Sequence, residues 1–438
     1  MLVLDIKVKI KLDGTPTYYT LDASEQGLIK SFNLKQELDS DISALIAPTS
    51  ANELKLSCIN YKGIFTASNT TSPLYGKLKE GTELTVFDGD TKIGTFYLTN
   101  YDAPTSSNSA TCALRAVDKL QSVLNRTVEL EQIHNNLTMK QYLTLVFQDV
   151  GFPLEDIVID EELENIVLNY TVINGKKLSE ILSDCMIASD SYCYISREDK
   201  VIVTKKNITG TATKHFNASN IVKVDIPKSM LNTANTLKVG YIVTKLSGVE
   251  KLLDLKEIGV KQGLTKLENH KLEKDNLYEL DSIKVSSTSG VYIEDVNSTQ
   301  STISMTLSSE IAEKVGVEVY GKTVIKSESF VKQQDTARVV EVGEKAIEVK
   351  SALLQSKAYA NNLLNTLWKR TQEPIPYVTI DTKTQSLGFN LLDIVDVIEP
   401  TRVKINFIGY IHSLDWTWHG GNAMSVVIGI KRTENEEV

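Results

Sequence analysis

Residues Gly316 to Thr323, GVEVYGKT, match the pattern G-x-x-x-x-G-K-[ST] of the loop that binds nucleotide phosphates. That chemistry needs a loop of small residues whose N–H groups point at the phosphates, followed directly by a helix N-terminus. Val317, Val319 and Tyr320 instead favour an extended strand, and the residues after Thr323 keep alternating apolar and polar side chains. The stretch is therefore predicted to be a strand that binds no nucleotide.

A second group of residue types that could do chemistry is His412, Asp415 and His419. On a strand, residues separated by an odd number point to opposite faces, so His412 is predicted to face away from the other two. A shared metal or hydrolytic site is not expected there. Trp416 and Trp418 share a face and are predicted to be core or subunit-interface aromatics, with an exposed carbohydrate platform as the alternative.

The remaining candidates lack the spacing that their chemistry requires. The acidic run from Glu155 to Glu164 has no Asp-x-Asp-x-Asp-Gly loop for calcium and is predicted to be solvated surface. The five histidines form no grouping with Ser, Cys or Asp that indicates a nucleophile. The four cysteines lack metal-ligand spacing and are predicted to be buried thiols in a reducing compartment. We therefore predict no catalytic, cofactor-binding or metal-binding residue and no cofactor.

The composition excludes further classes. The 438 residues are 42% hydrophobic and 24% charged, which is an ordinary soluble composition with room for two to four domains. The N-terminus alternates apolar and charged residues, which is typical neither of a secretory signal nor of a membrane span. The net charge of −9 and the scattered lysines argue against a nucleic-acid grip.

The sequence predicts that the chain folds mainly as β-strands, with one α/β insert. Short alternating strands over 1–118 predict a first barrel or sandwich, and helical periods over 119–206 predict the insert. We assign 207–245 to the start of a second barrel, 246–345 to a β-rich region of unassigned fold, and 346–438 to a helix and the remainder of the second barrel. The predicted fold class is two tube-like β-barrels, a small α/β domain and an additional β region.

Three helices are expected. One follows Thr138 as N-cap and ends at Gly151, a second carries Leu178, Ile181, Leu182 and Cys185, and a third runs over 346–372.

A faint internal repeat links the two ends of the chain. Ile93-Gly94 and Ile408-Gly409 each open a similar hairpin. Two barrels of one kind would explain the repeat, and a chance similarity of two hairpins is the alternative.

The order of these motifs resembles the baseplate hub proteins of phage tails and contractile bacteriocins. The resemblance rests on SPLYGKLKEGTELTVFDGDTKIGTFYLTNY, LTMKQYLTLVFQDVGFP, YTVINGKKLSEILSDCMIASDSYCYISREDKVIV and the final segment beginning LLDIVDVIEP. Ile93–Tyr97 resembles the strand that closes the first barrel in that family, and Gly175–Leu182 the start of the insert's helix. Tyr320-Gly321-Lys322 resembles an element before the last helix, whereas 246–345 matches poorly.

The resemblance implies a non-enzymatic homotrimer in which two tube-like barrels per subunit form a ring of six. Such a ring joins the sixfold tail tube to the central threefold spike. Its expected partners are the tail tube protein, the spike or tip protein, other baseplate proteins and the tape measure protein. The expected location is the baseplate of a virion or phage-tail-like particle assembled in the bacterial cytoplasm, with no membrane span and no specific nucleic-acid binding. The ring is expected to close through edge strands and the helix near Leu363 to Trp368, around an acidic or neutral lumen.

Two alternatives remain open at this point. A tail-associated peptidoglycan hydrolase would carry an added catalytic domain, and a carbohydrate-binding tail module would expose Trp416 and Trp418. A phage and a bacteriocin parent, and a contractile and a flexible tail, fit the sequence equally well.

Overall fold

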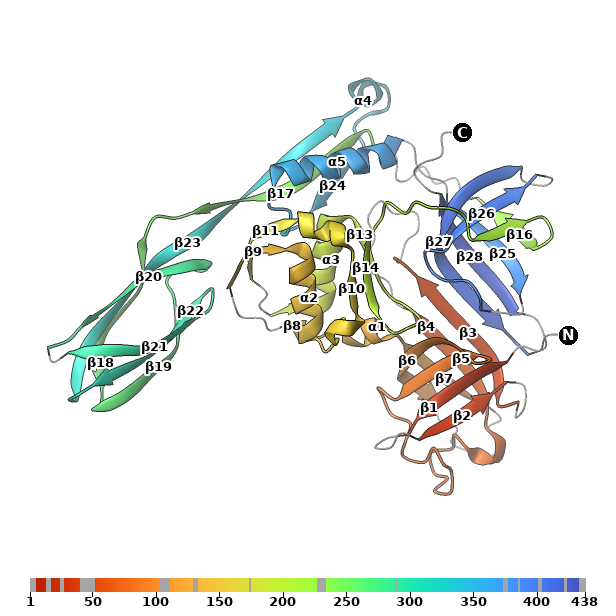
Figure 1. Cartoon of the computed structure of the whole chain (residues 1–438), viewed down its shortest axis with the longest axis horizontal. Helices are drawn as coiled ribbons and strands as arrows, with labels where there is room; N and C mark the ends of the chain where they lie inside the picture. Colours follow the sequence, from red (N-terminus) through yellow and green to blue (C-terminus); the bar gives the residue numbers. More distant parts are fainter. Residues whose placement is uncertain are drawn as a thin grey trace.

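The computed structural model describes residues 5–432 apart from 13–16, 24–26, 40–51, 103–110, 129–132, 173–174, 227–233, 289, 373–376, 385–386, 401–403 and 421–423. The fold is mainly β. Figure 1 shows the strands from the two ends of the chain lying together, the three short helices α1 to α3 in the middle, and a long β arm extending away from both.

The N-terminal strands form what we call the first unit. They are β1 (Ile6–Lys11), β2 (Tyr18–Asp22), β3 (Ile29–Glu37), β4 (Glu53–Ile59), β5 (Glu83–Asp88), β6 (Thr91–Asp102) and β7 (Thr111–Val117), with a short 3-10 turn, η1, over Tyr61–Gly63. In β1 the alternation buries Ile6, Val8 and Ile10 and leaves the lysines between them half-buried. One apolar face of the sheet thus packs inward.

A second unit is assembled from strands that are far apart in the sequence. They are β15 (Lys214–Asn217), β16 (Ile221–Asp225), β25 (Tyr377–Thr384), β26 (Ile394–Glu399), β27 (Ile405–Trp418) and β28 (Met424–Arg432). Strands β27 and β3 pair antiparallel, from Ser413 opposite Glu37 to Trp418 opposite Phe32. The two units therefore share one 13-stranded sheet and one apolar core.

The pairing corrects the expectation of two closed barrels. The strand order is β16-β25-β28-β27-β3-β4-β7-β6-β5-β1-β2, with β15 and β26 branching beside β27. Within the described residues this path has two ends, β16 and β2, so the sheet does not close. The long β27 prevents separation of the units because its first half pairs with β26 and its second half with β3.

The two units nevertheless repeat one topology. The order β3-β4-β7-β6-β5 corresponds to β16-β25-β28-β27-β26, with the same chain order and every neighbouring pair antiparallel. Residues paired across the first unit form the rows Asn33–Lys55–Arg115–Asn100, Phe32–Leu56–Leu114–Tyr101 and Ser31–Ser57–Ala113–Asp102. The matching rows of the second unit are Asp225–Thr379–Gly429–Ser413, Val224–Ile380–Ile428–Leu414 and Lys223–Asp381–Val427–Asp415.

Two register shifts fall at the same places in both repeats. One lies between Ile29 and Ser31 in β3 and between Ile221 and Lys223 in β16. The other lies between Leu98 and Asn100 in β6 and between Ile411 and Ser413 in β27. A bulge bends its strand and fixes the register. Matching bulges are therefore stronger evidence of a structural repeat than the faint sequence similarity of the two hairpins.

The register also refines the predicted repeat. It matches Gly409 with Phe96, two residues beyond Gly94, on the same face of the strand.

The insert lies between the units in sequence. Its helices are α1 (Lys119–Val123), α2 (Met139–Asp149) and α3 (Leu178–Ser189), with 3-10 turns η2 (Leu154–Asp156) and η3 (Glu161–Asn165). Its strands are β8 (Thr127–Val128), β9 (Ile133–Thr138), β10 (Ile157–Ile159), β11 (Val167–Val172), β12 (Lys176–Lys177), β13 (Ser191–Ile195) and β14 (Val201–Lys205). Thr138 caps α2 in a capping box with Gln141, which confirms the predicted N-cap.

The arm is inserted between β16 and β25. It contains β17 (Thr236–Leu246), β18 (Glu250–Val260), β19 (Gly263–Lys271), β20 (Leu277–Ser286), β21 (Val291–Ser298), β22 (Thr302–Ser309) and the 22-residue β23 (Glu313–Gln334). Strands β18 to β22 and the first half of β23 enclose a core of their own, which we call the tip. Strand β17 pairs with β23 and β24 rather than extending the large sheet.

The chain returns through α4 (Thr336–Val342), β24 (Ala346–Lys350) and α5 (Lys357–Gln372). The predicted helix over 346–372 is thus wrong in its first third, because AIEVK has a period of two and pairs with β17 as a strand. Apolar residues of α5, including Leu363 and Leu367, pack with the insert and the base of the arm in one core.

Candidate assembly surfaces and the junction between units

The stretch that matches the phosphate-binding pattern lies within β23, as predicted. Lys322 Nζ donates to Glu279 at 3.0 Å, and Thr323 Oγ1 donates to Glu250 at 2.8 Å. A Cβ on Gly321 would lie 2.6 Å from the backbone oxygen of Glu279. The glycine therefore serves the close approach of strands, and the Lys and Thr side chains are engaged within the sheet.

His412 belongs to a buried polar cluster that the sequence did not predict. Its Nε2 lies 3.0 Å from Oδ1 of Asp39, two residues beyond the end of β3, and both side chains are almost fully buried. Lys206 Nζ, from the end of the insert, lies 3.5 Å from the other oxygen of Asp39. The cluster thus joins side chains from the first unit, the insert and the second unit.

The charged groups in this cluster shift one another's pKa values. Burial lowers the pKa of His412, opposed by the carboxylate of Asp39. Burial acts to raise the pKa of Asp39, but His412, Lys206 and Lys431 together hold it below its usual range. Burial, with the neighbouring Lys206, lowers the pKa of Lys431 to about 8. At neutral pH both shifts favour a neutral imidazole beside a charged carboxylate.

Further contacts extend the junction to α5. Arg370 Nη1 donates to the carboxylate of Asp190 at 2.8 Å, and both side chains are largely buried. The hydroxyl groups of Tyr192 and Tyr410 lie 2.9 Å apart. Breaking a buried ion pair leaves an uncompensated charge, so the Arg370–Asp190 contact holds α5 against the insert, while the tyrosine contact joins the insert to the second unit.

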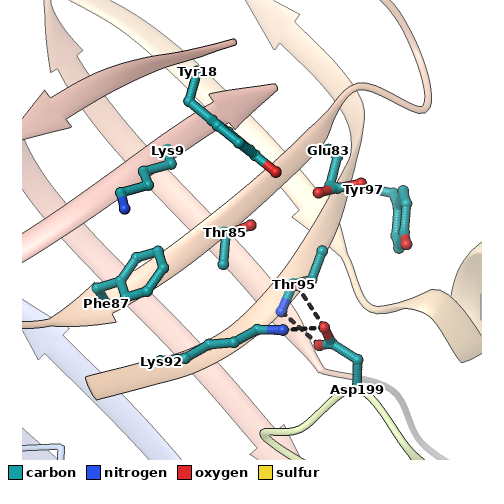
Figure 2. Close-up of a pocket in the computed structure, with 9 residues that line it drawn as sticks. All are labelled: Lys9, Tyr18, Glu83, Thr85, Phe87, Lys92, Thr95, Tyr97 and Asp199. Carbon is teal, nitrogen blue, oxygen red and sulfur yellow. Dashed lines mark hydrogen bonds and ion pairs between the residues drawn. The ribbon is translucent and has the colours of Figure 1, made fainter. Parts of the chain in front are cut away.

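Asp199, at the turn between β13 and β14, ties the insert to the first unit. Figure 2 shows its carboxylate receiving hydrogen bonds from the backbone and hydroxyl of Thr95, at 3.0 and 2.8 Å, and an ion pair with Lys92. Beside it lies an open hollow of about 360 Å³. Its lining is Lys9, Tyr18, Glu83, Thr85, Phe87, Lys92, Thr95, Tyr97 and Asp199. It contains neither a Cys nor a His, and the Thr95 hydroxyl and the Lys92 amine are both bound to the carboxylate of Asp199.

The other candidate residues from the sequence lie in or beside β27. His412 and Asp415 lie on opposite faces, as predicted, since His412 is buried and Asp415 is half-buried on the other side of β27, while His419 is exposed beyond its end. Trp416 and Trp418 are buried on the inner face. They therefore offer no platform for a sugar.

The acidic run over η2, β10 and η3 is mostly exposed, and Lys140 forms ion pairs with Glu161 and Glu164 there. Among the described residues, no three His, Cys, Asp or Glu side chains gather as a metal site. All four cysteines are buried free thiols. Burial raises their pKa, to about 12 for Cys112, so they are poor nucleophiles.

Some strand edges have no further strand beside them within the described residues. Strand β16 is one end of the large sheet, and β6 beyond its bulge pairs only with β7 in the part of the chain that is described. Asn100, Asp102 and Asp225 are exposed there. None of the described helices is both long and apolar enough to span a membrane.

Two solved structures are similar over nearly the whole chain. The 43 kDa tail protein of prophage MuSo2 from Shewanella oneidensis has 12% sequence identity and a TM-score of 0.56, covering 98% of this chain and 99% of that one. The tail protein from Neisseria meningitidis MC58 has 9% identity and a TM-score of 0.56, covering 98% and 96%. No family model and no curated protein matches the sequence. The chain has the fold of these tail proteins, which confirms the predicted resemblance at the level of the fold.

Sequence reasoning missed the junction because its members are scattered. Asp39, Lys206 and Lys431 lie in different parts of the chain, and none belongs to a recognisable motif. The only local signal was a histidine within the strongly apolar β27, where a polar side chain requires a partner.

Proposed function

We propose that the protein is a structural baseplate hub of a phage tail or a phage-tail-like particle. Three copies form a ring that joins the sixfold tail tube to the central threefold spike. The observation that carries the proposal is the repeated unit: each chain supplies two units of one strand order and register, joined edge to edge by β27 and β3. Three such chains offer six similar units to a sixfold partner and three identical subunits to a threefold one.

The fold likeness to tail proteins over 98% of the chain supports the same proposal. The partners of the ring are the tail tube protein, the spike or tip protein, the tape measure protein and other baseplate proteins. The protein acts in the baseplate after assembly in the bacterial cytoplasm. The two tube-like units form the ring, while the insert and the arm lie outside it and contact other baseplate proteins.

A non-enzymatic role is consistent with the side chains described above. The thiols are buried, the histidine of β27 is paired with Asp39, and the hollow of Figure 2 is lined by neither a Cys nor a His. The buried positions of Trp416 and Trp418 give the carbohydrate-binding alternative no support.

The mass of the purified full-length chain tests the proposal. Sedimentation equilibrium at micromolar concentration is expected to give three times the chain mass of 48.6 kDa. A monomer at these concentrations, alone and when mixed with a tail tube protein encoded beside it, would contradict the proposed ring.

A further inference from the structure

We propose that the tip swings on a hinge within the arm and that Tyr170 of the insert latches it in the orientation seen in Figure 1. The hinge is the short stretch in which residues 243–245 of β17 pair with residues 325–327 of β23, which we call the neck. The inference goes beyond the proposed function and does not rest on it, because the hinge and the latch lie within one chain.

The neck connects two separately packed regions. On one side, Val239 and Val331 lie opposite each other in the core that the insert, α5 and the base of the arm share. On the other side, Val317 and Val319 belong to the core of the tip. None of the six side chains of the neck itself is buried. Because each region packs its own apolar side chains, a turn of the tip relative to the base leaves both cores intact.

The neck is also the narrowest part of the arm. Strand β24 pairs with β17 only from Thr236 to Gly240, and β18 and β20 pair with β23 no further than Thr323. Within the described residues the neck is therefore a two-stranded ribbon, which can be followed in Figure 1 between the base and the tip. An isolated pair of strands is only marginally stable, so it bends more easily than the wider sheets on either side.

Tyr170 reaches across the neck from the insert to the tip. It lies on β11, and its hydroxyl donates to the backbone oxygen of Leu277, the first residue of β20, at 3.1 Å. Its ring centroid lies 6.3 Å from that of Tyr278 and 5.0 Å from the ammonium group of Lys326 in the neck. The side chain is only 2% exposed, yet it lies between the two cores rather than within either. Its contacts thus join the insert, the neck and the tip.

The backbone of Tyr170 is fixed to the base of the arm. Gln355, which precedes α5, donates from Nε2 to the backbone oxygen of Tyr170 at 2.7 Å and accepts at Oε1 from its N–H at 3.1 Å. Burial raises the pKa of the Tyr170 hydroxyl to about 12, so the hydroxyl remains a donor at neutral pH.

The latch is weak enough to be released. Its hydrogen bond to the tip changes an equilibrium by about fivefold, as a typical hydrogen bond in a protein does. A partner that binds the tip more tightly in the swung orientation therefore shifts the tip towards that orientation.

Distances between spin labels on the tip and the insert test the inference in the full-length chain. Leu264→Cys on the tip and Val158→Cys on the insert place the labels at exposed positions, whereas the four native cysteines are buried. Labelled chain is mixed with an excess of unlabelled chain, so that distances within one copy are measured. We expect one principal distance in the wild-type background. Tyr170→Phe, which removes only the hydroxyl, is expected to raise the population at other distances about fivefold.

Tyr192→Phe is the matched control, because it removes the hydroxyl of another buried tyrosine, which contacts Tyr410 at the junction between the insert and the second unit. It is expected to leave the distances unchanged. Hydrogen exchange provides a second measurement. Amides of the neck are expected to exchange faster than those of the base and the tip, because the neck has neither buried side chains nor a third strand. Exchange in the core of the tip should be the same in Tyr170→Phe and the wild type.

The outcomes test the latch and the hinge separately. The same distance distribution in Tyr170→Phe and the wild type would overturn the latch. Neck amides as well protected as those of Val239 and Val331 would overturn the hinge. Faster exchange in the tip core of Tyr170→Phe would also overturn the latch, because the variant would then unfold the tip rather than release it. Each measurement reports on a single chain, so none of these results decides whether the proposed ring forms.

Discussion

His412 and Asp39 form a buried contact between the two units, so its protonation affects how the units are held together. The pKa of His412 in the folded protein is lowered by burial despite the nearby carboxylate. Below about pH 6.5 the unfolded chain therefore binds a proton that the folded chain does not, and the free energy of unfolding falls. Above that pH the histidine is neutral in both states and this effect vanishes.

The variant His412→Gln is expected to be less stable than the wild type at pH 8, because it disturbs a buried contact. It is also expected to lose less stability between pH 7 and pH 5, by about 1.4 kcal/mol for each unit by which the histidine pKa is lowered. Urea unfolding across this pH range measures both effects. His419→Gln, at an exposed position, is the control, and equal pH slopes for His412→Gln and the wild type would contradict the assignment.

A substitution at Gly321 tests whether this glycine, within the stretch that matches the phosphate-binding pattern, is required for close packing of strands. In Gly321→Ala the new Cβ would lie 2.6 Å from the Glu279 backbone oxygen and 2.9 Å from Leu252. We expect a loss of about 1–3 kcal/mol in the stability of the tip, since overpacking shifts the neighbouring strands. Hydrogen exchange of the tip amides measures the loss.

Gly259→Ala is the matched control, because a Cβ there meets no atom within 4 Å. Similar exchange rates in the two variants would show that Gly321 is not held by close strand packing.

At the scale of elements, the start of α2 is stabilised by a capping box formed by Thr138 and Gln141. Thr138 Oγ1 accepts from the N–H of Gln141 at 3.2 Å, and the Gln141 side chain accepts from the N–H of Thr138 at 3.0 Å. Thr138→Ala is expected to destabilise the insert by about 1 kcal/mol. Thermal unfolding measures this change, while Thr138→Ser, which keeps the hydroxyl, should stay close to the wild type. An unchanged melting temperature for Thr138→Ala would contradict the capping role.

Local patterns predicted the elements that local chemistry determines. The cap and apolar spacing predicted α2, and alternation predicted that GVEVYGKT is a strand. The sequence predicts a helix from residue 346 onward, but residues 346–350 pair with β17, more than 100 residues earlier, and form a strand. Likewise, no local signal links Trp418 with Phe32, yet that pairing fuses the two units.

The repeat was only faint in the sequence for a physical reason. The inward-facing row requires apolar side chains but not particular ones, so Phe32 corresponds to Val224 and Tyr101 to Leu414. The arm and α5 also separate β16 from β25, whereas a short segment separates β3 from β4. The shared bulges and rows are visible only once the strands are paired.

At the scale of the whole molecule, the net charge determines whether an assembled ring binds duplex DNA. The chain has 56 acidic and 47 basic residues, so three copies carry three times its net charge of −9. We predict an acidic or neutral lumen and no sub-micromolar affinity for duplex DNA at about 150 mM salt, because phosphate binding needs clustered basic residues. Fluorescence anisotropy measures the affinity. A tight complex that weakens steeply with salt would contradict the prediction.

The central claim is that two repeated units per chain build a threefold ring. Electron cryo-microscopy of the full-length assembly tests it most directly. We expect a closed ring of three chains with six similar lobes, in which the first and second units alternate and the three arms project from the ring. A ring lined by only one unit of each chain, or particles containing a single chain, would contradict it.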